Sequence, residues 1–162
     1  MNTTKLHYTG NVKLNLKLSN GHIINLTRHN NGLPDLMKVI CKFLSGNGDN
    51  YADVPKYIDL RKESAQGTFN SHLKSMSVIT GSNYSNLTGN WVTTLTASIP
   101  YEQLNEPISE TDKTNYRLYL ISGEDKSSNT QELAYLDISA EELSRISAGT
   151  VGIIEWILTI SN

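Results

Sequence analysis

Regular alternation of apolar and polar residues is the dominant pattern in the first part of this chain. Residues 12–18 place Val or Leu at every second position with Lys or Asn between them, which predicts a strand with one buried face. Asn20-Gly21 follows, and this dipeptide favours the tight turn of a hairpin because both residues tolerate positive φ. Residues 22–26 read as the returning strand. Residues 1–10, and 5–8 in particular, are consistent with an edge strand or an N-terminal arm.

Further strands are predicted along the rest of the chain. In residues 91–99 the alternation places Trp91 and Leu95 on one face. The other segments that read as strands are residues 54–61, 76–79, 116–121 and 133–138. Residues 54–61 are expected at an edge or as an entry strand, because Pro55 cannot donate a ladder hydrogen bond. Polar composition and weak patterning make residues 62–75, 81–90 and 122–130 read as loops.

One segment has helical rather than strand periodicity. Between Leu33 and Leu44 the apolar residues recur at spacings of three and four, which places them on one side of an amphipathic helix. Pro34 suits the first turn of this helix, and the Gly-Asn-Gly of residues 46–48 ends it. The helix is expected at about residues 34–45, covering one opening or face of a β core.

The C-terminal segment combines a helical turn with a long apolar run. Ser139 followed by Glu142 matches a capping box, which predicts a short helical turn at about residues 139–147. Residues 151–160 then predict a long strand that inserts between strands formed earlier in the chain.

This closing strand is apolar on both sides. If Trp156 and the residues alternating with it face the core, then Ile153, Glu155 and Ile157 lie on the opposite face. A strand that is apolar on both faces is usually covered on both. The second face is therefore predicted to lie against the helix or against another subunit.

These elements, roughly eight strands with one helix and one capped turn, predict a mainly β fold in a single domain of residues 1–162. An antiparallel β-sandwich or jelly roll with one amphipathic helix fits the order of elements best. A more central helix would make the fold α+β instead.

Composition narrows the classes of partner and location. Charged residues are 19% of the chain and the net charge is −2, which gives no reason to expect nucleic acid or an anionic membrane as a partner. The single cysteine, Cys41, excludes an internal disulfide. The N-terminal residues lack the features of a signal peptide, and no apolar run is long enough to cross a membrane. Synthesis in a cytoplasm is expected.

The sequence contains no motif for catalysis, metal binding or cofactor binding. The four histidines have no metal-ligand spacing, and neither a nucleophile elbow nor a phosphate-binding loop occurs. We therefore expect no enzyme activity, no cofactor and no metal. Glu155 lies between two isoleucines and is expected to pair with a base such as Arg117 or Lys17, or to lie at a subunit contact. A general-acid role for Glu155 would need a second carboxylate.

Aromatic and loop residues offer candidate contact surfaces. Trp91 and Trp156 alternate with aliphatic residues and are predicted to pack in the core. Tyr84, Leu87 and Tyr101 are expected outside the regular strands. They are candidates for an exposed interaction surface, together with the face that carries Ile153, Glu155 and Ile157.

Three patches resemble small virion proteins of tailed bacteriophages. They are His-Asn-Asn-Gly-Leu-Pro-Asp-Leu at residues 29–36, Val-Pro-Lys-Tyr-Ile-Asp-Leu at 54–60, and the terminal residues 149–162. The resemblance implies a head-fibre, decoration, collar or tail component located in the virion. Its partners would then be further copies of itself and other virion proteins, and no catalytic residue is carried over.

Two other classes of function stay open. The first is a β-sandwich module that binds a carbohydrate or cell-surface ligand, such as a host glycan, through residues 81–90 and 122–130. The second is a glycoside- or peptide-cleaving enzyme, which would need a cleft with two carboxylates or a nucleophile beside a histidine.

Overall fold

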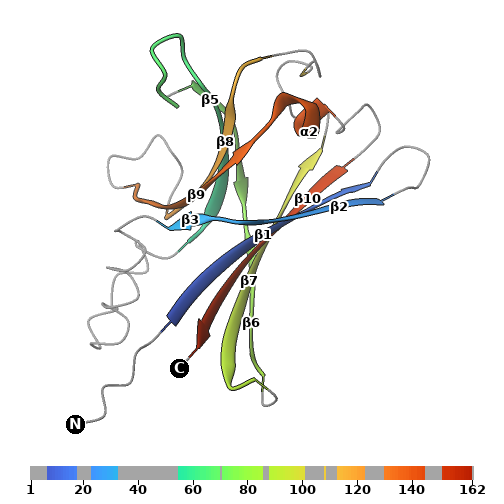
Figure 1. The fold of residues 1–162 in the computed structure, drawn as a ribbon, viewed down its shortest axis with the longest axis vertical. Helices are drawn as coiled ribbons and strands as arrows, with labels where there is room; N and C mark the ends of the chain where they lie inside the picture. Colours follow the sequence, from blue (N-terminus) through green and yellow to red (C-terminus); the bar gives the residue numbers. More distant parts are fainter. Residues whose placement is uncertain are drawn as a thin grey trace.

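A computed structural model of the chain describes residues 7–17, 23–32, 55–69, 71–85, 88–100, 108, 113–122, 130–144 and 151–161. Ten strands within these ranges form two antiparallel sheets of five strands each, and one short helix, α2 (Ala140–Ser144), precedes the last strand (Figure 1). The chain is therefore mainly β, as its alternating pattern predicts. The helix predicted at about 34–45 lies outside the described residues, as do residues 1–6.

Each sheet combines strands from distant parts of the chain. Sheet A has the order β2 (Ile23–His29), β1 (His7–Lys17), β10 (Val151–Ser161), β7 (Asn90–Pro100) and β6 (Ile79–Ser85). Sheet B has the order β3 (Asn31–Gly32), β9 (Glu132–Ile138), β8 (Tyr116–Ile121), β4 (Tyr57–Lys62) and β5 (Ser71–Ser77). The predicted hairpin of residues 12–26 is confirmed by the pairing of β1 with β2. Residues 7–10 form the first part of β1, where they pair with β10.

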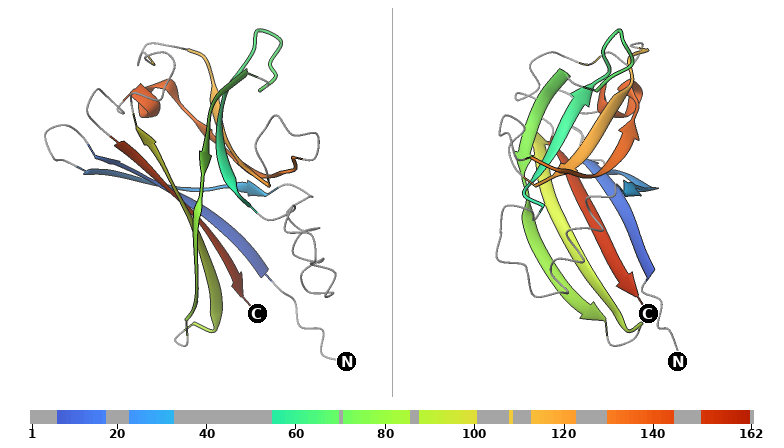
Figure 2. Two further views of the ribbon diagram at one scale, coloured as in Figure 1. Left: turned by 180° about the vertical axis from the view of Figure 1, so that it is seen from behind. Right: turned by 90° about the vertical axis from the view of Figure 1, so that its left-hand side faces the viewer.

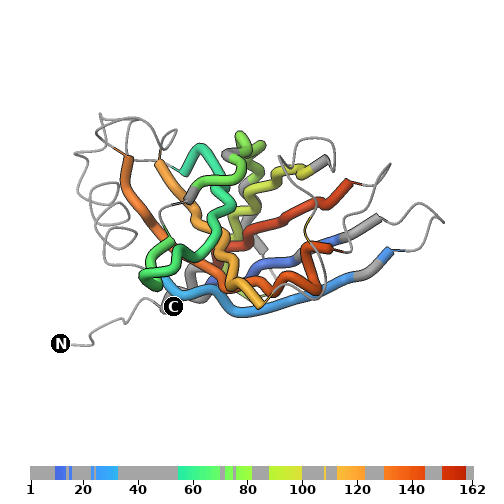
Figure 3. Tube along the Cα trace, turned by 90° about the horizontal axis from the view of Figure 1, so that it is seen from above, coloured from blue at the N-terminus to red at the C-terminus, as the bar shows by residue number. Residues whose placement is uncertain are grey.

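Two strands pass from one sheet into the other and join the sheets at both lateral edges. β2 continues through Asn30 into β3, and β5 continues through Val78 into β6 (Figure 1). The backbone stays hydrogen-bonded at these bends, because Asn30 N donates to Gly10 O at 3.1 Å and Val78 N donates to Lys56 O at 2.9 Å. Bent strands form such corners between packed sheets. Figure 3, seen from above, shows β2 and β3 as one tube along one side of the molecule.

The last strand occupies the centre of sheet A. All of β10 pairs with β1, with Val151 opposite Lys17 and Ser161 opposite His7, and its other side pairs with β7. The prediction that this segment inserts between strands formed earlier is confirmed. Because β1 and β7 are joined only through β10 in the strand order, sheet A is complete only when the C-terminal residues join it.

The inner faces of the two sheets share one hydrophobic core. Sheet A contributes Val12, Leu95 and Trp156, and sheet B contributes Leu60 and Leu118, each at most 1% exposed. Burial of such side chains stabilises the fold by about 25 cal/mol for each Å² of apolar surface removed from water. The result is a sandwich-like arrangement in which each sheet also has an outer face.

β4 lies inside sheet B, between β8 and β5, so the edge position predicted for residues 54–61 is wrong. Pro55 precedes the strand, where its missing N–H removes no ladder bond. The four residues from Ile58 to Arg61 are all buried, because β4 has neighbours on both sides and packs on the core with one face.

Two predicted loops contain strands instead. β5 takes up the second half of residues 62–75, and β6 takes up part of residues 81–90. The register of β5 shifts beside Leu73, so that Leu73 and Met76, three positions apart, both contact the core. Such an irregularity breaks the period of two on which the sequence pattern depends. β6 is an edge strand whose Gly, Ser and Asn residues have the composition of a turn.

Candidate functional site

Exposed apolar side chains gather on the outer face of sheet A. Among the described residues, the exposed large hydrophobic side chains are Ile23 (62%), Ile79 (79%), Trp91 (58%), Val151 (39%) and Ile153 (38%). Ile23 and Val151 lie opposite the same residue, Lys17. Ile79 lies opposite Thr96, which in turn lies opposite Glu155. By this register, Ile23, Ile79 and Val151 lie on the same outer face of sheet A as Ile153, whereas Trp91 does not.

The closing strand has the two faces that its alternation predicts. Ile154 and Trp156 are fully buried in the core, whereas Ile153 is exposed and Glu155 and Ile157 are half-buried. The second face of β10 is thus the outer face of sheet A. Within one chain this face retains exposed apolar surface at its centre.

Glu155 is held within sheet A by a neutral side chain. Asn15 Nδ2 donates a hydrogen bond to Glu155 Oε2 at 3.1 Å, and Lys13 lies directly opposite Glu155 in the register. The predicted pairing with Arg117 is wrong, because Arg117 belongs to β8 in sheet B. The other predicted partner, Lys17, lies opposite the first residue of β10 instead.

Uncharged polar residues occupy most other positions on the outer face of sheet A. They include Asn11, Asn25, Thr27, Thr94, Thr96 and Thr159. Charged residues are depleted at the centre of protein–protein interfaces, where each charge must lose its hydration. Charged residues are few on this face, although Lys13 and Glu155 lie opposite each other on its neighbouring strands β1 and β10.

The structure separates Tyr84 from this face. Tyr84 belongs to β6 and lies opposite Trp91, which shares the inner side of β7 with Leu95. The register thus places Tyr84 on the side of sheet A opposite Ile153, within a strand and not in a loop. Leu87 and Tyr101, the other two candidates from predicted loops, lie outside the described residues.

Trp91 is not a core residue. Its side chain is 58% exposed, whereas Trp156 is fully buried as predicted. Trp91 stands near the start of β7, and Figure 2 shows that this end of sheet A extends beyond sheet B. The inner face of sheet A therefore has no partner sheet at this point, and a position that alternates with core residues is exposed.

A buried ionic cluster lies on the outer face of sheet B. Asp59 is fully buried, and its Oδ2 accepts a hydrogen bond from Arg61 Nε at 2.6 Å and lies 2.7 Å from His72 Nδ1. Arg61 also pairs with Glu132, and its guanidinium lies 4.2 Å from the centre of the Tyr119 ring. Burial alone would lower the pKa of Arg61, but its hydrogen bonds to Asp59 and Glu132 raise that pKa above its ordinary value.

A second arginine is enclosed by aromatic rings further along the same face. The Arg117 guanidinium lies 4.0 Å from the centre of the Phe69 ring and 4.1 Å from that of Tyr135. Arg117 Nε donates to Asp137 Oδ1 at 2.6 Å, and Nη1 donates to Tyr119 Oη at 3.3 Å. Burial would lower the pKa of Arg117, but these hydrogen bonds raise it. Arg117 is thus fixed in position, as expected of a guanidinium stacked on aromatic faces.

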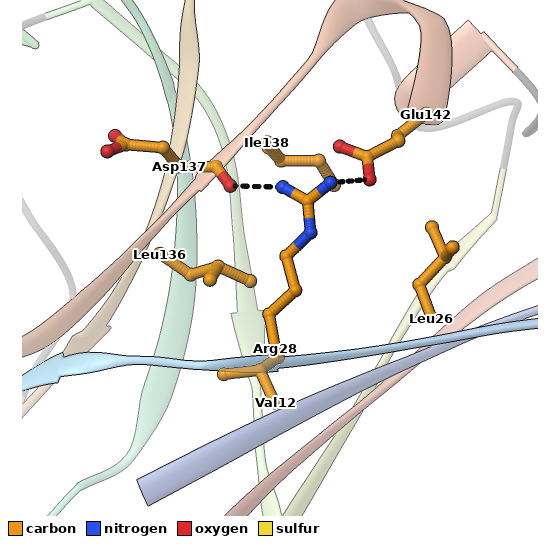
Figure 4. Close-up of a pocket in the computed structure, with 7 residues that line it drawn as sticks. All are labelled: Val12, Leu26, Arg28, Leu136, Asp137, Ile138 and Glu142. Atoms are coloured by element: carbon orange, nitrogen blue, oxygen red, sulfur yellow. Dashed lines mark hydrogen bonds and ion pairs between the residues drawn. The ribbon is translucent and has the colours of Figure 1, made fainter.

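Arg28 connects sheet A to the end of sheet B. It extends from β2 past Leu136 toward α2, donating to the backbone oxygen of Asp137 at 3.3 Å and pairing with Glu142 (Figure 4). Glu142 Oε2 in turn accepts from Ser139 N at 2.9 Å, which confirms the predicted capping box. The cavity around Arg28 has a volume of about 10 Å³, enough for one water at most.

A larger groove lies beside this connection. It has a volume of about 420 Å³ and is lined by Arg28, Glu63, Phe69, Asn115, Arg117 and Asp137, among others. β2, β8 and β9 and the connection from β4 to β5 each supply part of its wall. Its volume is within the range of about 300–1,000 Å³ that is typical of ligand sites.

The charged and aromatic residues on the outer face of sheet B were not recognised from the sequence as a site, although a signal for them exists. Asp59 and Arg61, Arg117 and Tyr119, and Tyr135 and Asp137 each stand two apart in adjacent strands of sheet B. Charged and aromatic residues at a period of two indicate a polar outer face. Sequence alone does not give the order of strands that brings the three pairs together.

Among the described residues, no group of three or more His, Cys, Asp or Glu side chains is arranged to hold a metal ion. No helix in the part of the chain that the structure describes is long and apolar enough to cross a membrane. Comparisons with protein-family models, with curated proteins and with solved structures find no match for this chain.

Proposed function

We propose that this chain is a structural component of a bacteriophage virion, as a head-fibre, decoration, collar or tail protein. It acts by binding a second copy of itself, and then other virion proteins, through the outer face of sheet A. The observation that carries the proposal is the set of exposed apolar residues, Ile23, Ile79, Val151 and Ile153, on this one face. The resemblance of three sequence patches to small virion proteins supports the biological setting.

The size of the face suits a stable contact. Five strands at a spacing of about 4.8 Å and a mean length of about 30 Å give a flat area of about 700 Å². A specific interface buries about 800 Å² on each partner. The isoleucines stand on β2, β6 and β10, so they are spread across the width of the sheet, as an interface of this extent requires.

The proposal extends to the finer description of the fold. The two sheets and their corner strands belong to an antiparallel β-sandwich of the jelly-roll class, with an amphipathic helix at about 34–45 over one opening. Several copies assemble through their outer faces. No catalytic step is part of the proposed function.

The test has two measurements. Native mass spectrometry of the purified chain at micromolar concentration is expected to give a defined oligomer, and a stable monomer would contradict self-association. Mass spectrometry of purified phage particles is expected to find the chain in several copies for each particle. A chain that stays in the lysate and never sediments with particles would contradict the virion assignment even if it self-associates.

The groove on sheet B favours a second candidate function, a module that binds a carbohydrate or cell-surface ligand. Its wall combines the Phe69 ring with the charged and amide groups of Arg117, Asp137, Glu63 and Asn115. The two functions are compatible, because the groove and the outer face of sheet A belong to different sheets. The site differs from the one expected from sequence, since residues 81–85 all belong to β6 and residues 123–129 lie outside the described part.

A further inference from the structure

The two guanidinium groups in the wall of the groove beside Arg117 already have their positive charge compensated. Arg117 is bound by Asp137, and Arg28 is bound by Glu142, so each guanidinium in the wall already has a carboxylate partner. An anionic ligand would have to displace Asp137 from Arg117. The remaining carboxylate of the wall, Glu63, accepts from the neutral side chain of Asn115, so its negative charge also opposes an anionic ligand. Charge complementarity therefore disfavours a ligand with net negative charge.

The polar groups in the wall are nevertheless able to form further hydrogen bonds. Asp137 accepts from Arg117 through Oδ1, and its side chain is 60% exposed, which leaves Oδ2 accessible to a ligand donor. Glu63 accepts from Asn115 through Oε2 at 2.5 Å, and Oε1 is a further acceptor. Hydroxyl groups both donate and accept, so they match a wall that mixes carboxylate acceptors with amide and guanidinium donors.

One part of the wall is apolar and flat. The Phe69 ring and the Arg117 guanidinium both line this groove and stack on each other at 4.0 Å, and Phe69 is half-buried. A ring of this kind packs against the apolar face of a flat ligand, while polar groups at the edges fix its orientation. Sugar rings have such a C–H face and carry hydroxyls around it.

We infer that the groove binds an uncharged sugar, as one or two units of a neutral glycan. Phe69 packs against the ring, and the carboxylates of Asp137 and Glu63 accept from its hydroxyls. Asn115 and Arg117 hold these carboxylates in place. This inference rests on the second function proposed above and is independent of self-association through sheet A.

The experiment measures binding of the full chain to an array of neutral, sialylated and sulfated glycans, followed by titration calorimetry with the best neutral ligand. The variants Phe69→Ala and Glu63→Gln are compared with the matched control Trp91→Ala, which removes an exposed aromatic residue far from the groove. Binding is expected to weaken at least about tenfold in the first two and to stay unchanged in the control. Thermal unfolding curves verify that every variant is folded.

Each other result overturns part of the inference. Neutral-glycan binding that survives in both groove variants would leave the carbohydrate function standing and move the site elsewhere. Loss of binding in Trp91→Ala alone would assign the site to the exposed end of sheet A. Binding of charged glycans only would refute the neutral ligand. A chain that binds no glycan more tightly than about 1 mM would refute both the ligand and the second function.

Discussion

Arg28 and Glu142, which are 114 residues apart in the chain, form an ion pair that joins sheet A to the helical turn before the closing strand. Glu142 completes this connection from inside a capping box, because its other carboxylate oxygen accepts from the backbone and hydroxyl of Ser139. One carboxylate thus fixes the start of α2 and also the position of α2 relative to β2.

The variants Glu142→Gln and Glu142→Ala separate these two contributions. Gln is also accepted at this position of a capping box, so Glu142→Gln loses mainly the ion pair. Arg28 is 48% exposed and solvent weakens the pair, so the expected loss is at most about 1 kcal/mol. Glu142→Ala loses the cap as well and is expected to lower the free energy of unfolding by about 1–3 kcal/mol. Urea titrations measure both, and equal losses in the two variants would contradict the dual role.

The buried carboxylate of Asp59 is expected to matter more than the other acids of its cluster. Asp59→Ala removes the fully buried carboxylate that pairs with the buried Arg61 guanidinium, whereas the partner Glu132 that remains is partly exposed, which predicts a loss of about 3–5 kcal/mol. Glu132 is 43% exposed, so Glu132→Ala is the matched control and is expected to lose no more than about 1 kcal/mol. Denaturant unfolding of both variants tests this order. A larger loss in Glu132→Ala than in Asp59→Ala would contradict it.

Self-association through sheet A is expected to depend on its exposed isoleucines. The double variant Ile79→Thr and Ile153→Thr keeps β-branched side chains, so strand preference is retained while apolar surface is removed. The dissociation constant from sedimentation velocity is expected to rise at least about tenfold. Trp91→Thr, an exposed position on the other side of the same sheet, is the control. An unchanged dissociation constant in the double variant would assign the contact to another surface.

The different exposure of the two tryptophans gives a direct optical test. Trp156 is fully buried and Trp91 is 58% exposed. In the variant Trp91→Phe, the remaining fluorescence is expected to be blue-shifted and poorly quenched by iodide, because a buried indole is shielded from the solvent. In Trp156→Phe, the emission of Trp91 is expected to be readily quenched. Equal quenching in the two variants would contradict the position of β7.

Sequence reasoning succeeded where one strand face dominates the residue pattern. β1 and β7 alternate regularly because sheet A has a buried inner face and a more exposed outer face over most of their length, and β10 was recognised by its long apolar run. The same rule misassigned Trp91, since alternation identifies a face and does not show where the opposing sheet ends. The capping box was visible because Ser139 and Glu142 are local in sequence.

The features that were missed depend on distant parts of the chain. β5 was not predicted because the irregularity at Leu73 interrupts its alternation. β6 was not predicted because its residues have the composition of a turn, and they form a strand by pairing with β7. The Arg117 site depends on Phe69 and Tyr135, which come from segments on either side of it in the sequence. Such contacts follow from strand order, which local patterns do not contain. The residues on the outer face of β10 could be predicted from the sequence. The identity of its two neighbours, β1 and β7, could not, and it follows from the strand order.

The position of β10 leads to the strongest expectation for folding. Deletion of residues 151–162 removes the strand that lies between β1 and β7, along with the buried side chains of Ile154 and Trp156. The truncated chain is expected to show no cooperative thermal transition, because the two halves of sheet A lose the strand that pairs with both of them and the core loses the large side chain of Trp156. Trp156→Ala in the full chain is the milder variant, with an expected loss of about 3–5 kcal/mol. A truncated chain that unfolds cooperatively with the enthalpy of the full chain would show that sheet A forms without its central strand.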